Sequence, residues 1–308
     1  MTRPCPGCGS AEARPFAEKN GHRLVRCRRC ATLFTSDAAC GTYDDYYDAE
    51  NLEGPPFLAK RLDDIVATFA PARRTGRLLD VGFGSGELLE AARRAGWAVS
   101  GVEVALPAVE QARRRGVDAF HGTLHDAPFD AGSFDVVVAS EIFEHICDVR
   151  PLLDDVARVL RPGGLLWATT PHSRGLSARL LGASWSVISP PEHVQLFSIA
   201  GVRALLRSAG FGDAVVSAEG VNPYEILRRG KMEGRRVDSA YAVNAFFEER
   251  RGRRAAKRAI NRVLSALRLG DSLKIAARKT VTLAPDSCGE GGSRSGSPRW
   301  LAREASRR

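Results

Sequence analysis

Four cysteines near the N-terminus stand at a spacing that suits a metal ion. The segments "CPGCGS" and "CRRC" place Cys5, Cys8, Cys27 and Cys30 as two C-x2-C pairs with 18 residues between them. Two such pairs can present four thiolates to a tetrahedral zinc ion. The segment holds few large apolar side chains, so metal binding rather than burial would stabilise it. We therefore predict a structural zinc site in a zinc ribbon. The alternative, a thioredoxin-like redox pair, lacks the βαβ sequence around it that it needs.

A glycine-rich stretch follows a short apolar run. In "LLDVGFGSGE", Gly82, Gly84 and Gly86 stand directly before a helical pattern that begins at Glu87. Glycines allow a tight turn and let a ligand approach the backbone N–H groups. A dinucleotide loop of the form G-x-G-x-x-G would have its third glycine at position 87, where the glutamate repels a pyrophosphate. A dehydrogenase is therefore a remote interpretation.

Acidic side chains surround this loop. Asp80 precedes it, and Glu103 ends the next apolar run, "VSGVEV". A carboxylate at that strand end can accept both ribose hydroxyls of an adenosine ligand. S-adenosylmethionine has no phosphate and carries an ammonium and a sulfonium group, so an acidic neighbourhood suits it better than it suits a dinucleotide. The loop is thus predicted to bind S-adenosylmethionine.

Three histidines stand where a methyl acceptor would need a base. Methyl transfer to a hydroxyl or ammonium group requires removal of a proton, and imidazole has an unperturbed pKa near neutrality. His145 in "EIFEHI" and His172 in "TTPHS" follow apolar runs, and His193 lies in "PPEHVQLFS". We name His193 and His145 as candidate catalytic bases and rank His172 behind them. A structural or substrate-lining role is the alternative for each.

These residues need a scaffold of alternating strands and helices. Between Arg77 and Lys279, β-branched runs alternate with helical patterns, which predicts an α/β fold with a parallel sheet covered by helices. The run "FDVVVAS" is apolar throughout, as in a strand buried on both faces. "LRPGG" is interpreted as a helix end and a turn. Strands are expected at residues 77–81, 98–103, 118–121, 134–139, 165–170, 213–217 and 272–280, and helices at 87–95, 107–115, 148–160 and 199–209.

The motifs in their order resemble the class I S-adenosylmethionine-dependent methyltransferases. The segments that carry the resemblance are "LLDVGFGSGELLEAARRAGWAVSGVEV", "GTLHDAPFDAGSFDVVVASEIFEHI" and "LRPGGLLWATTPH". The chain is most similar to a bacterial small-molecule subgroup with an N-terminal zinc-binding segment, over roughly residues 5–280. The resemblance implies a doubly wound, Rossmann-like sheet of seven strands whose last strand is antiparallel.

The resemblance also implies roles for single residues. Asp80 and the three glycines would contact the methionine part of the cofactor, and Glu103 the ribose. The family usually has an acidic residue beside the adenine where this sequence has Thr123, so either the Thr123 hydroxyl or Asp126 would hold the adenine amino group. The complete set of implied cofactor-binding residues is Asp80, Gly82, Gly84, Gly86, Glu103, Thr123, Leu124, Ser140 and Glu141.

The charge and composition of the chain limit its possible binding partners and its location. The net charge is +9, and residues 222–308 hold 21 Lys and Arg against 9 Asp and Glu. A basic part can bind nucleic acid, but it is more often a solvated helical face with a basic tail. No run of apolar residues is long enough to span a membrane, and the N-terminus lacks the apolar core of a signal peptide. We expect a cytoplasmic protein without a membrane partner.

The expected organisation has four segments. An arginine-rich insertion before the last strand is expected to be an amphipathic cap over the substrate side or a dimer contact. Tyr43, Tyr46 and Tyr47 either cover the cofactor pocket or pack against the first helix. The segments are a zinc ribbon at 1–36, a linker and helical lid at 37–76, the methyltransferase domain at 77–284 with the insertion at 222–270, and a disordered basic tail at 285–308.

The resulting prediction is a methyltransferase, monomeric or homodimeric, whose acceptor is a sugar, a nucleotide-sugar or a secondary metabolite. One alternative is an RNA methyltransferase that uses the zinc ribbon and the basic C-terminal part to bind RNA. Another is a nucleic-acid-binding or scaffold protein without catalytic activity. The leading interpretation has no nucleic-acid partner.

Overall fold

The protein contains two sheets joined through one short strand. The computed structural model describes residues 3–37, 58–222, 225–226 and 251–280. The larger sheet has seven strands in the order β10-β11-β8-β7-β4-β5-β6, and β11 is antiparallel to both of its neighbours. The strands of this sheet are β4 (Arg77–Val81), β5 (Ala98–Glu103), β6 (Asp118–His121), β7 (Phe134–Ser140), β8 (Leu160–Pro171), β10 (Phe211–Glu219) and β11 (Ser272–Lys279). The predicted fold class and the antiparallel last strand are confirmed.

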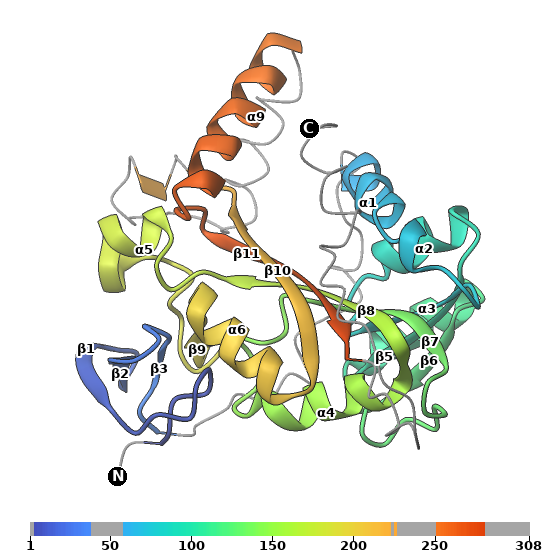
Figure 1. The fold of residues 1–308 in the computed structure, drawn as a ribbon, viewed down its shortest axis with the longest axis horizontal. Helices are drawn as coiled ribbons and strands as arrows, with labels where there is room; N and C mark the ends of the chain where they lie inside the picture. Colours follow the sequence, from blue (N-terminus) through green and yellow to red (C-terminus); the bar gives the residue numbers. More distant parts are fainter. Residues whose placement is uncertain (1–2, 38–57, 223–224, 227–250, 281–308) are drawn as a thin grey trace, which may run out of the picture.

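Helices cover both faces of this sheet (Figure 1). Buried side chains of α4 and α6 belong to one hydrophobic cluster, and those of α1, α2 and α3 to a second. The helices are α1 (Leu58–Ala67), α2 (Glu87–Arg94), α3 (Leu106–Arg114), α4 (Val149–Val159), α5 (Leu176–Leu181), α6 (Ile199–Ser208) and α9 (Arg251–Ala266), with short 3-10 turns η1 (Ala70–Ala72) and η2 (Gly182–Ser184).

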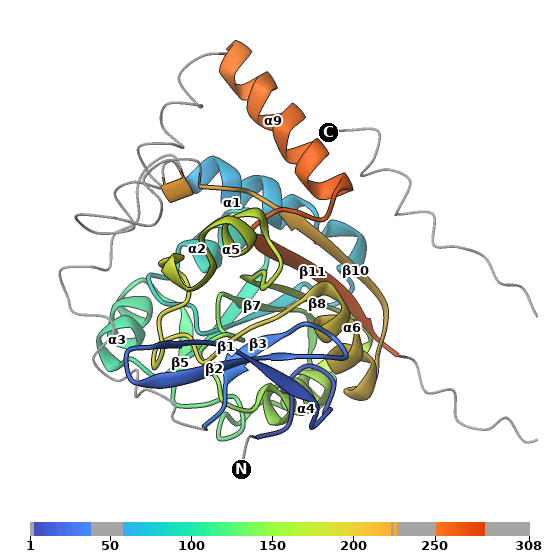
Figure 2. The same cartoon turned by 90° about the vertical axis from the view of Figure 1, so that its left-hand side faces the viewer.

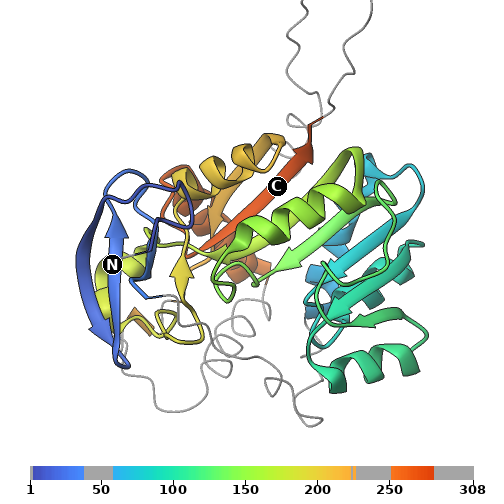
Figure 3. The ribbon, with the colours of Figure 1, turned by 90° about the horizontal axis from the view of Figure 1, so that it is seen from below.

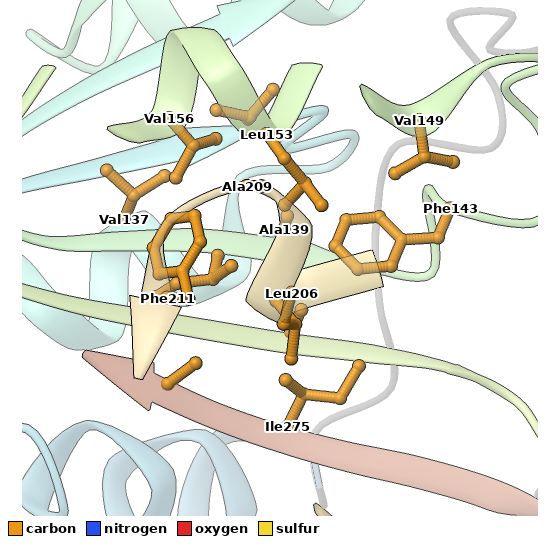
Figure 4. Close-up of a cluster of buried hydrophobic side chains, with 14 of the residues drawn as sticks. Val137, Ala139, Phe143, Val149, Leu153, Val156, Leu206, Ala209, Phe211 and Ile275 are labelled. Carbon is orange, nitrogen blue, oxygen red and sulfur yellow. The ribbon is translucent and has the colours of Figure 1, made fainter. Parts of the chain in front are cut away.

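Strand β7 shows why both faces are covered. Successive side chains of a strand point to opposite faces. Val136 and Val138 pack into the cluster under α1 to α3, whereas Val137 and Ala139 pack into the cluster under α4 and α6 (Figure 4). All four are fully buried. The continuous apolar run in the sequence is therefore the signature of a central strand.

The Pro-Gly-Gly segment does not separate a helix from a strand, so that prediction is wrong. Strand β8 begins at Leu160, and its register against β7 shifts between the pairs Phe134–Leu160 and Val136–Leu165. The four residues 161–164 therefore lie opposite one residue of β7. Gly163 has a φ of 70°. Since proline cannot donate to a ladder and glycine tolerates positive φ, the segment forms a bulge inside the strand.

The N-terminal segment forms a four-stranded antiparallel sheet with a strand from far along the chain. Its own strands are β1 (Ala13–Lys19), β2 (His22–Cys27) and β3 (Leu33–Thr35). The fourth is β9 (Gln195–Leu196), which pairs with β3. Figure 3 shows these blue strands beside the yellow β9 at one end of the molecule. The four-cysteine segment is thus docked against the loop region before α6.

The predicted insertion includes one well-defined helix. In Figures 1 and 2, α9 extends away from the sheet. Leu264 is buried at its base, whereas Ile260, Val263 and Leu267 are exposed. Tyr43, Tyr46 and Tyr47, the predicted tail and residues 227–250 lie outside the described residues. Within the described part of the chain, no helix is long and apolar enough to cross a membrane.

The buried side chain of Asp135 holds the backbone segment that leads into β4. Asp135 in β7 is fully buried, and its Oδ2 accepts the backbone N–H groups of Arg74, Thr75 and Gly76, each at 2.7 Å. Arg161 Nε donates to Oδ1 at 2.5 Å. Burial by itself raises the pKa of Asp135, but the hydrogen bond from Arg74 and the contact with Arg161 outweigh it, so the pKa lies below its ordinary value.

We expect Asp135→Asn to lower the free energy of unfolding by about 3–5 kcal/mol at pH 7, because the amide presents a donor to groups that all donate. The stabilisation by Asp135 is present above the unfolded pKa of about 3.9 and is lost as the pH falls through the lower folded pKa. The difference between the variant and the wild type should therefore shrink below about pH 4 in urea titrations. Asp130→Asn, on an exposed loop, is the matched control. An unchanged difference down to about pH 2 would contradict this account.

Candidate active site

The glycine loop forms a cradle at the carboxyl end of β4. Gly82, Gly84 and Gly86 all have positive φ, at 66°, 52° and 76°. A Cβ atom on Gly82 would lie 2.6 Å from Ile142 Cδ1, so a side chain there would clash. Helix α2 starts directly afterwards at Glu87, so its first N–H groups lie at the end of the loop. The glycines thus allow the tight turn between β4 and α2 and the close approach of Ile142.

Glu103 connects this cradle to the end of β5. Its Oε2 accepts the Gly84 N–H at 2.9 Å, and its Oε1 accepts the N–H groups of Val104 and Ala105 at 2.8 and 3.1 Å. The side chain is 6% exposed. A carboxylate offers about four lone-pair positions, so one more donor such as a ribose hydroxyl can be accommodated. The predicted ribose-binding residue therefore lies directly beside the predicted glycine loop.

Asp80 lies beneath the cradle on β4 and is 3% exposed. Burial raises its pKa well above the ordinary value, and the negative charge of Glu103 raises it further. A cationic ligand nearby would stabilise the ionised form of both carboxylates. The electrostatics of the cradle thus favour a ligand with positive charge.

The predicted adenine residues follow β6. The Thr123 hydroxyl donates to Asp126 Oδ2 at 2.6 Å, and both side chains are exposed. Thr123 therefore orients the carboxylate of Asp126. The Leu124 side chain is 2% exposed and lies in the hydrophobic core, which leaves its backbone for contact with a ligand. The two alternatives for the adenine amino group are thus one hydrogen-bonded pair.

The residues after β7 complete this edge of the sheet. Ser140 Oγ and Thr169 Oγ1 share a hydrogen bond of 2.8 Å between β7 and β8. Glu141 is exposed, has a φ of 55° and donates its N–H to Thr169 O. Strand β7 is parallel to β4, so these residues lie on the same edge as the glycine loop.

Two of the three candidate histidines lie together. The rings of His145 and His193 have their centroids 4.6 Å apart. His145 Nδ1 lies 3.0 Å from the Glu192 carbonyl oxygen, and His193 Nδ1 lies 2.6 Å from that of Val187. The structure therefore joins the two histidines that the sequence ranked first.

His172 has a different environment. It is 2% exposed, and its Nδ1 lies 3.0 Å from the Gly270 carbonyl oxygen. Burial lowers its pKa to about 4, so the ring is neutral at pH 7. It is held where β8 and the start of β11 meet, since its N–H donates to Asp271 O.

Glu144 is the functional candidate that the sequence reasoning missed. It is 1% exposed, and the Thr170 hydroxyl donates to its Oε2 at 2.9 Å. Burial, and then the negative charge of Glu141, raise its pKa well above the ordinary value. One carboxylate oxygen of Glu144 and one ring nitrogen each of His145 and His193 all lie within 4.8 Å of one another. We call Glu144, His145 and His193 the acceptor-side cluster.

The four N-terminal cysteines converge as the sequence predicted. Cys5 and Cys30 have their sulfur atoms 3.4 Å apart, and Cys8 and Cys27 3.6 Å apart. Four Zn–S bonds of about 2.3 Å in tetrahedral geometry separate the sulfur atoms by about 3.8 Å, so the cluster fits zinc closely. The hydrogen bond from Cys5 lowers the pKa of Cys30 to about 5, which favours a thiolate there. The donor set and its geometry are those of a closed structural site.

Backbone hydrogen bonds connect the cysteine segment to the acceptor-side cluster. Thr35 N donates to Val194 O at 2.9 Å, and Val194 N donates to Glu144 O at 2.9 Å. The Gln195 side chain donates to the carbonyl groups of Phe143 and Ile146, at 2.9 and 2.6 Å. The N-terminal sheet therefore positions both the residue that precedes β9 and the turn that follows β7.

The family model and the curated proteins compared with this chain are all described as methyltransferases. Residues 56–215, a little over half of the chain, match the family described as "Methyltransferase domain". The chain is 28% identical to a ubiquinone biosynthesis O-methyltransferase of Chelativorans sp. (strain BNC1), over 42% of this chain and 57% of that protein. It is 32% identical to the 27-O-demethylrifamycin SV methyltransferase of Amycolatopsis mediterranei (strain S699), over 53% and 63%. The chain thus spans less than two thirds of the length of these curated relatives.

Solved structures that resemble this chain have low sequence identity to it. A SAM-dependent methyltransferase from Archaeoglobus fulgidus is 18% identical, with a TM-score of 0.49 over 77% of this chain and 97% of that chain.

We expect Cys27→Ser to abolish stoichiometric metal binding at the cysteine cluster, because a hydroxyl is a poor fourth ligand for a site built of thiolates. Elemental analysis of the purified full chain should find about one zinc in the wild type and far less in the variant. His22→Ala removes the one histidine of residues 1–36 and should retain the zinc. Equal zinc content in Cys27→Ser and the wild type would contradict a four-cysteine site.

Proposed function

The chain belongs to the methyltransferase domain family, and we propose that it transfers the methyl group of S-adenosylmethionine to a small-molecule acceptor. The observation that carries this proposal is the hydrogen bond from the Gly84 N–H to Glu103 Oε2, which holds the carboxylate that we propose as the ribose ligand against the glycine cradle. Glu87 at the start of α2 adds negative charge, and a cationic ligand would favour the ionised form of the buried Asp80 beneath the cradle.

The proposed cofactor position follows the strand ends from β4 to β7. The methionine part would lie on the loop from Gly82 to Gly86, the ribose at Glu103, and the adenine beside Leu124 with its amino group at the Thr123–Asp126 pair. Ser140 and Glu141 would line the sulfonium end. The parallel strands bring all of these residues to one edge of the sheet, where ligands bind in such folds.

The chain's own residues have three tasks in the transfer. S-adenosylmethionine, when bound, supplies a methyl group activated by the positive sulfur. The loop residues hold that group in line with the acceptor, and alignment of this kind removes much of the entropic barrier. His193 or His145 removes the acceptor proton in this proposal, since the two rings lie together close to the turn after β7. Burial of Glu144 and His193 limits the access of bulk water to this part of the site.

Small-molecule acceptors are favoured by the relatives. The two curated proteins compared above are named for O-methylation of ubiquinone precursors and of a rifamycin, and both names describe small molecules. We extend this class to the present chain as a sugar, nucleotide-sugar or secondary metabolite. The zinc of the cysteine cluster is assigned a structural role, since four thiolates leave no position for a substrate. The chain acts as a monomer or homodimer in this proposal.

We expect Glu103→Ala to weaken S-adenosylmethionine binding by about 10- to 100-fold, because hydrogen bonds to a charged group contribute roughly 1.5–3 kcal/mol. Titration calorimetry of the full chain measures this directly. Glu110→Ala, an exposed glutamate on α3 paired with Arg114, is the matched control and should bind like the wild type. Absence of micromolar binding by the wild type, with Glu103→Ala no different, would contradict every methyltransferase interpretation.

A screen with isotope-labelled methyl donor identifies the acceptor. Metabolite pools incubated with the chain and labelled S-adenosylmethionine should yield labelled small molecules and little labelled RNA. Phosphate-driven RNA binding falls steeply with salt. Tight, strongly salt-dependent binding of bulk RNA together with labelled RNA would instead support the RNA methyltransferase alternative.

A further inference from the structure

The acceptor-side cluster contains a buried carboxylate oxygen whose charge needs a partner. Glu144 is 1% exposed, and Thr170 bonds only its Oε2. Its Oε1 has no hydrogen-bond partner among the described residues. A buried carboxylate is strongly disfavoured unless it is paired with a positive charge or fully hydrogen-bonded. The position therefore favours either a proton or a cation at Oε1.

The neighbours of Glu144 favour a cation. Glu141 lies three residues earlier, and its negative charge acts on Glu144. One ring nitrogen each of His145 and His193 completes a group of ligand atoms within 4.8 Å. A metal ion among these three ligand atoms would be attracted by the Glu144 carboxylate and by both imidazoles, and the charge of the exposed Glu141 nearby would add to this attraction. The donor types are those that bind divalent ions of the first transition series.

The histidine rings are oriented as metal ligands usually are. Each Nδ1 lies within hydrogen-bond distance of a backbone carbonyl oxygen, that of Glu192 for His145 and that of Val187 for His193. A carbonyl accepts, so the proton of each neutral ring is on Nδ1 and the lone pair is on Nε2. Metal-bound histidines typically donate their other ring N–H to such an oxygen, which fixes the tautomer and the ring plane.

We propose that Glu144, His145 and His193, with Glu141 beside them, bind a divalent transition-metal ion that contacts an oxygen of the methyl acceptor. This inference rests on the proposed function and narrows its acceptor class to hydroxyl compounds that can approach a metal. The site is separate from the four-cysteine cluster, whose soft thiolates select zinc in a closed geometry. Three protein ligands would leave positions open for the acceptor.

The location suits that role. The turn that carries Glu144 and His145 follows β7, and Ile142 in the same turn contacts Gly82 of the cofactor cradle closely enough to exclude a side chain there. The proposed ion would thus lie beside the methyl end of the cofactor site. A divalent ion lowers the pKa of a hydroxyl that it contacts. With both imidazoles bound to the ion, the ion replaces the histidine as the group that promotes loss of the acceptor proton. That proton leaves to solvent, the oxygen lone pair forms the new C–O bond, and the electrons of the broken C–S bond return to sulfur.

Titration of the full chain with Mn²⁺ tests the site without cofactor or acceptor. The protein is prepared with its cysteine-bound zinc intact, as verified by elemental analysis, and free Mn²⁺ is measured by electron paramagnetic resonance. We expect about one Mn²⁺ per wild-type chain, and at least about tenfold weaker binding in Glu144→Gln and His193→Ala. His125→Ala, an exposed histidine paired with Asp155, is the matched control and should bind Mn²⁺ like the wild type.

Thermal unfolding keeps the test decisive where a variant is less stable. Saturating Mn²⁺ should raise the melting temperature of the wild type by about 5 °C or more and leave that of Glu144→Gln unchanged. Glu144→Gln keeps the shape and the acceptor for Thr170, and His145→Gln serves as a further variant. The proposal is overturned if the wild type shows no saturable Mn²⁺ binding, or if Glu144→Gln binds and is stabilised as the wild type is. The first result, with activity intact, would indicate a proton relay through the same residues.

The outcomes separate this inference from the proposed function. Mn²⁺ binding is measured without S-adenosylmethionine, so a chain that binds Mn²⁺ but not the cofactor would sustain the metal site and contradict the methyltransferase proposal. A chain that binds the cofactor through Glu103 but takes up no Mn²⁺ would support the methyltransferase proposal and contradict the metal site.

Discussion

The backbone of Val194 joins the two sheets of this protein. Its carbonyl oxygen accepts the N–H of Thr35 from the N-terminal sheet, and its N–H donates to the carbonyl oxygen of Glu144 beside the acceptor-side cluster. Strand β9 starts at the next residue and pairs with β3. His193 is therefore held from both sides, by the cysteine segment and by the turn after β7. Any change that separates the sheets would displace this histidine.

Two different groups of polar residues lie along one edge of the seven-stranded sheet, one towards each end of that edge. The strand ends of β4, β5 and β6 present the glycine loop, Glu103 and the Thr123–Asp126 pair, which suit an adenosine ligand. The ends of β7 and β8, with the loop before β9, present a buried carboxylate and two imidazoles. The cysteine segment packs against the second part through a cluster that includes Leu33, Trp185 and Leu196, and it also contacts the start of α6, where Ser198 donates a hydrogen bond to Cys30 O. The cysteine segment thus contacts the part of this edge that carries Glu144, His145 and His193.

Local patterns predicted the elements that depend on local physics. The alternating runs and the glycine loop gave the order of strands and helices, because hydrophobic periodicity and glycine conformations act within a few residues. The Pro-Gly-Gly bulge in β8 was misread, since the same residues mark a turn or a bulge depending on the neighbouring strand. Strand β9 has only two residues, and its partner Leu33 lies far away in the chain. No local signal predicts such a pairing.

The sequence also predicted some residues of the candidate site and missed others. His145 after an apolar run and His193 in a loop that follows two prolines are conspicuous in the sequence, and the structure brings their rings together. Glu144 was missed because a glutamate in a polar turn is usually solvated, and its burial against Thr170 depends on tertiary packing. Glu103 was identified because its distance from the glycines follows from the geometry of one βαβ unit.

A crystal structure of the full chain grown with S-adenosylhomocysteine and Mn²⁺ tests the central claim most directly. The account predicts a ribose hydroxyl on the Glu103 carboxylate, the methionine part on the glycine loop, and the sulfur atom on the side of the acceptor-side cluster, with anomalous density for manganese among Glu144, His145 and His193. A ligand bound elsewhere, or one whose sulfur points away from that cluster, would contradict it.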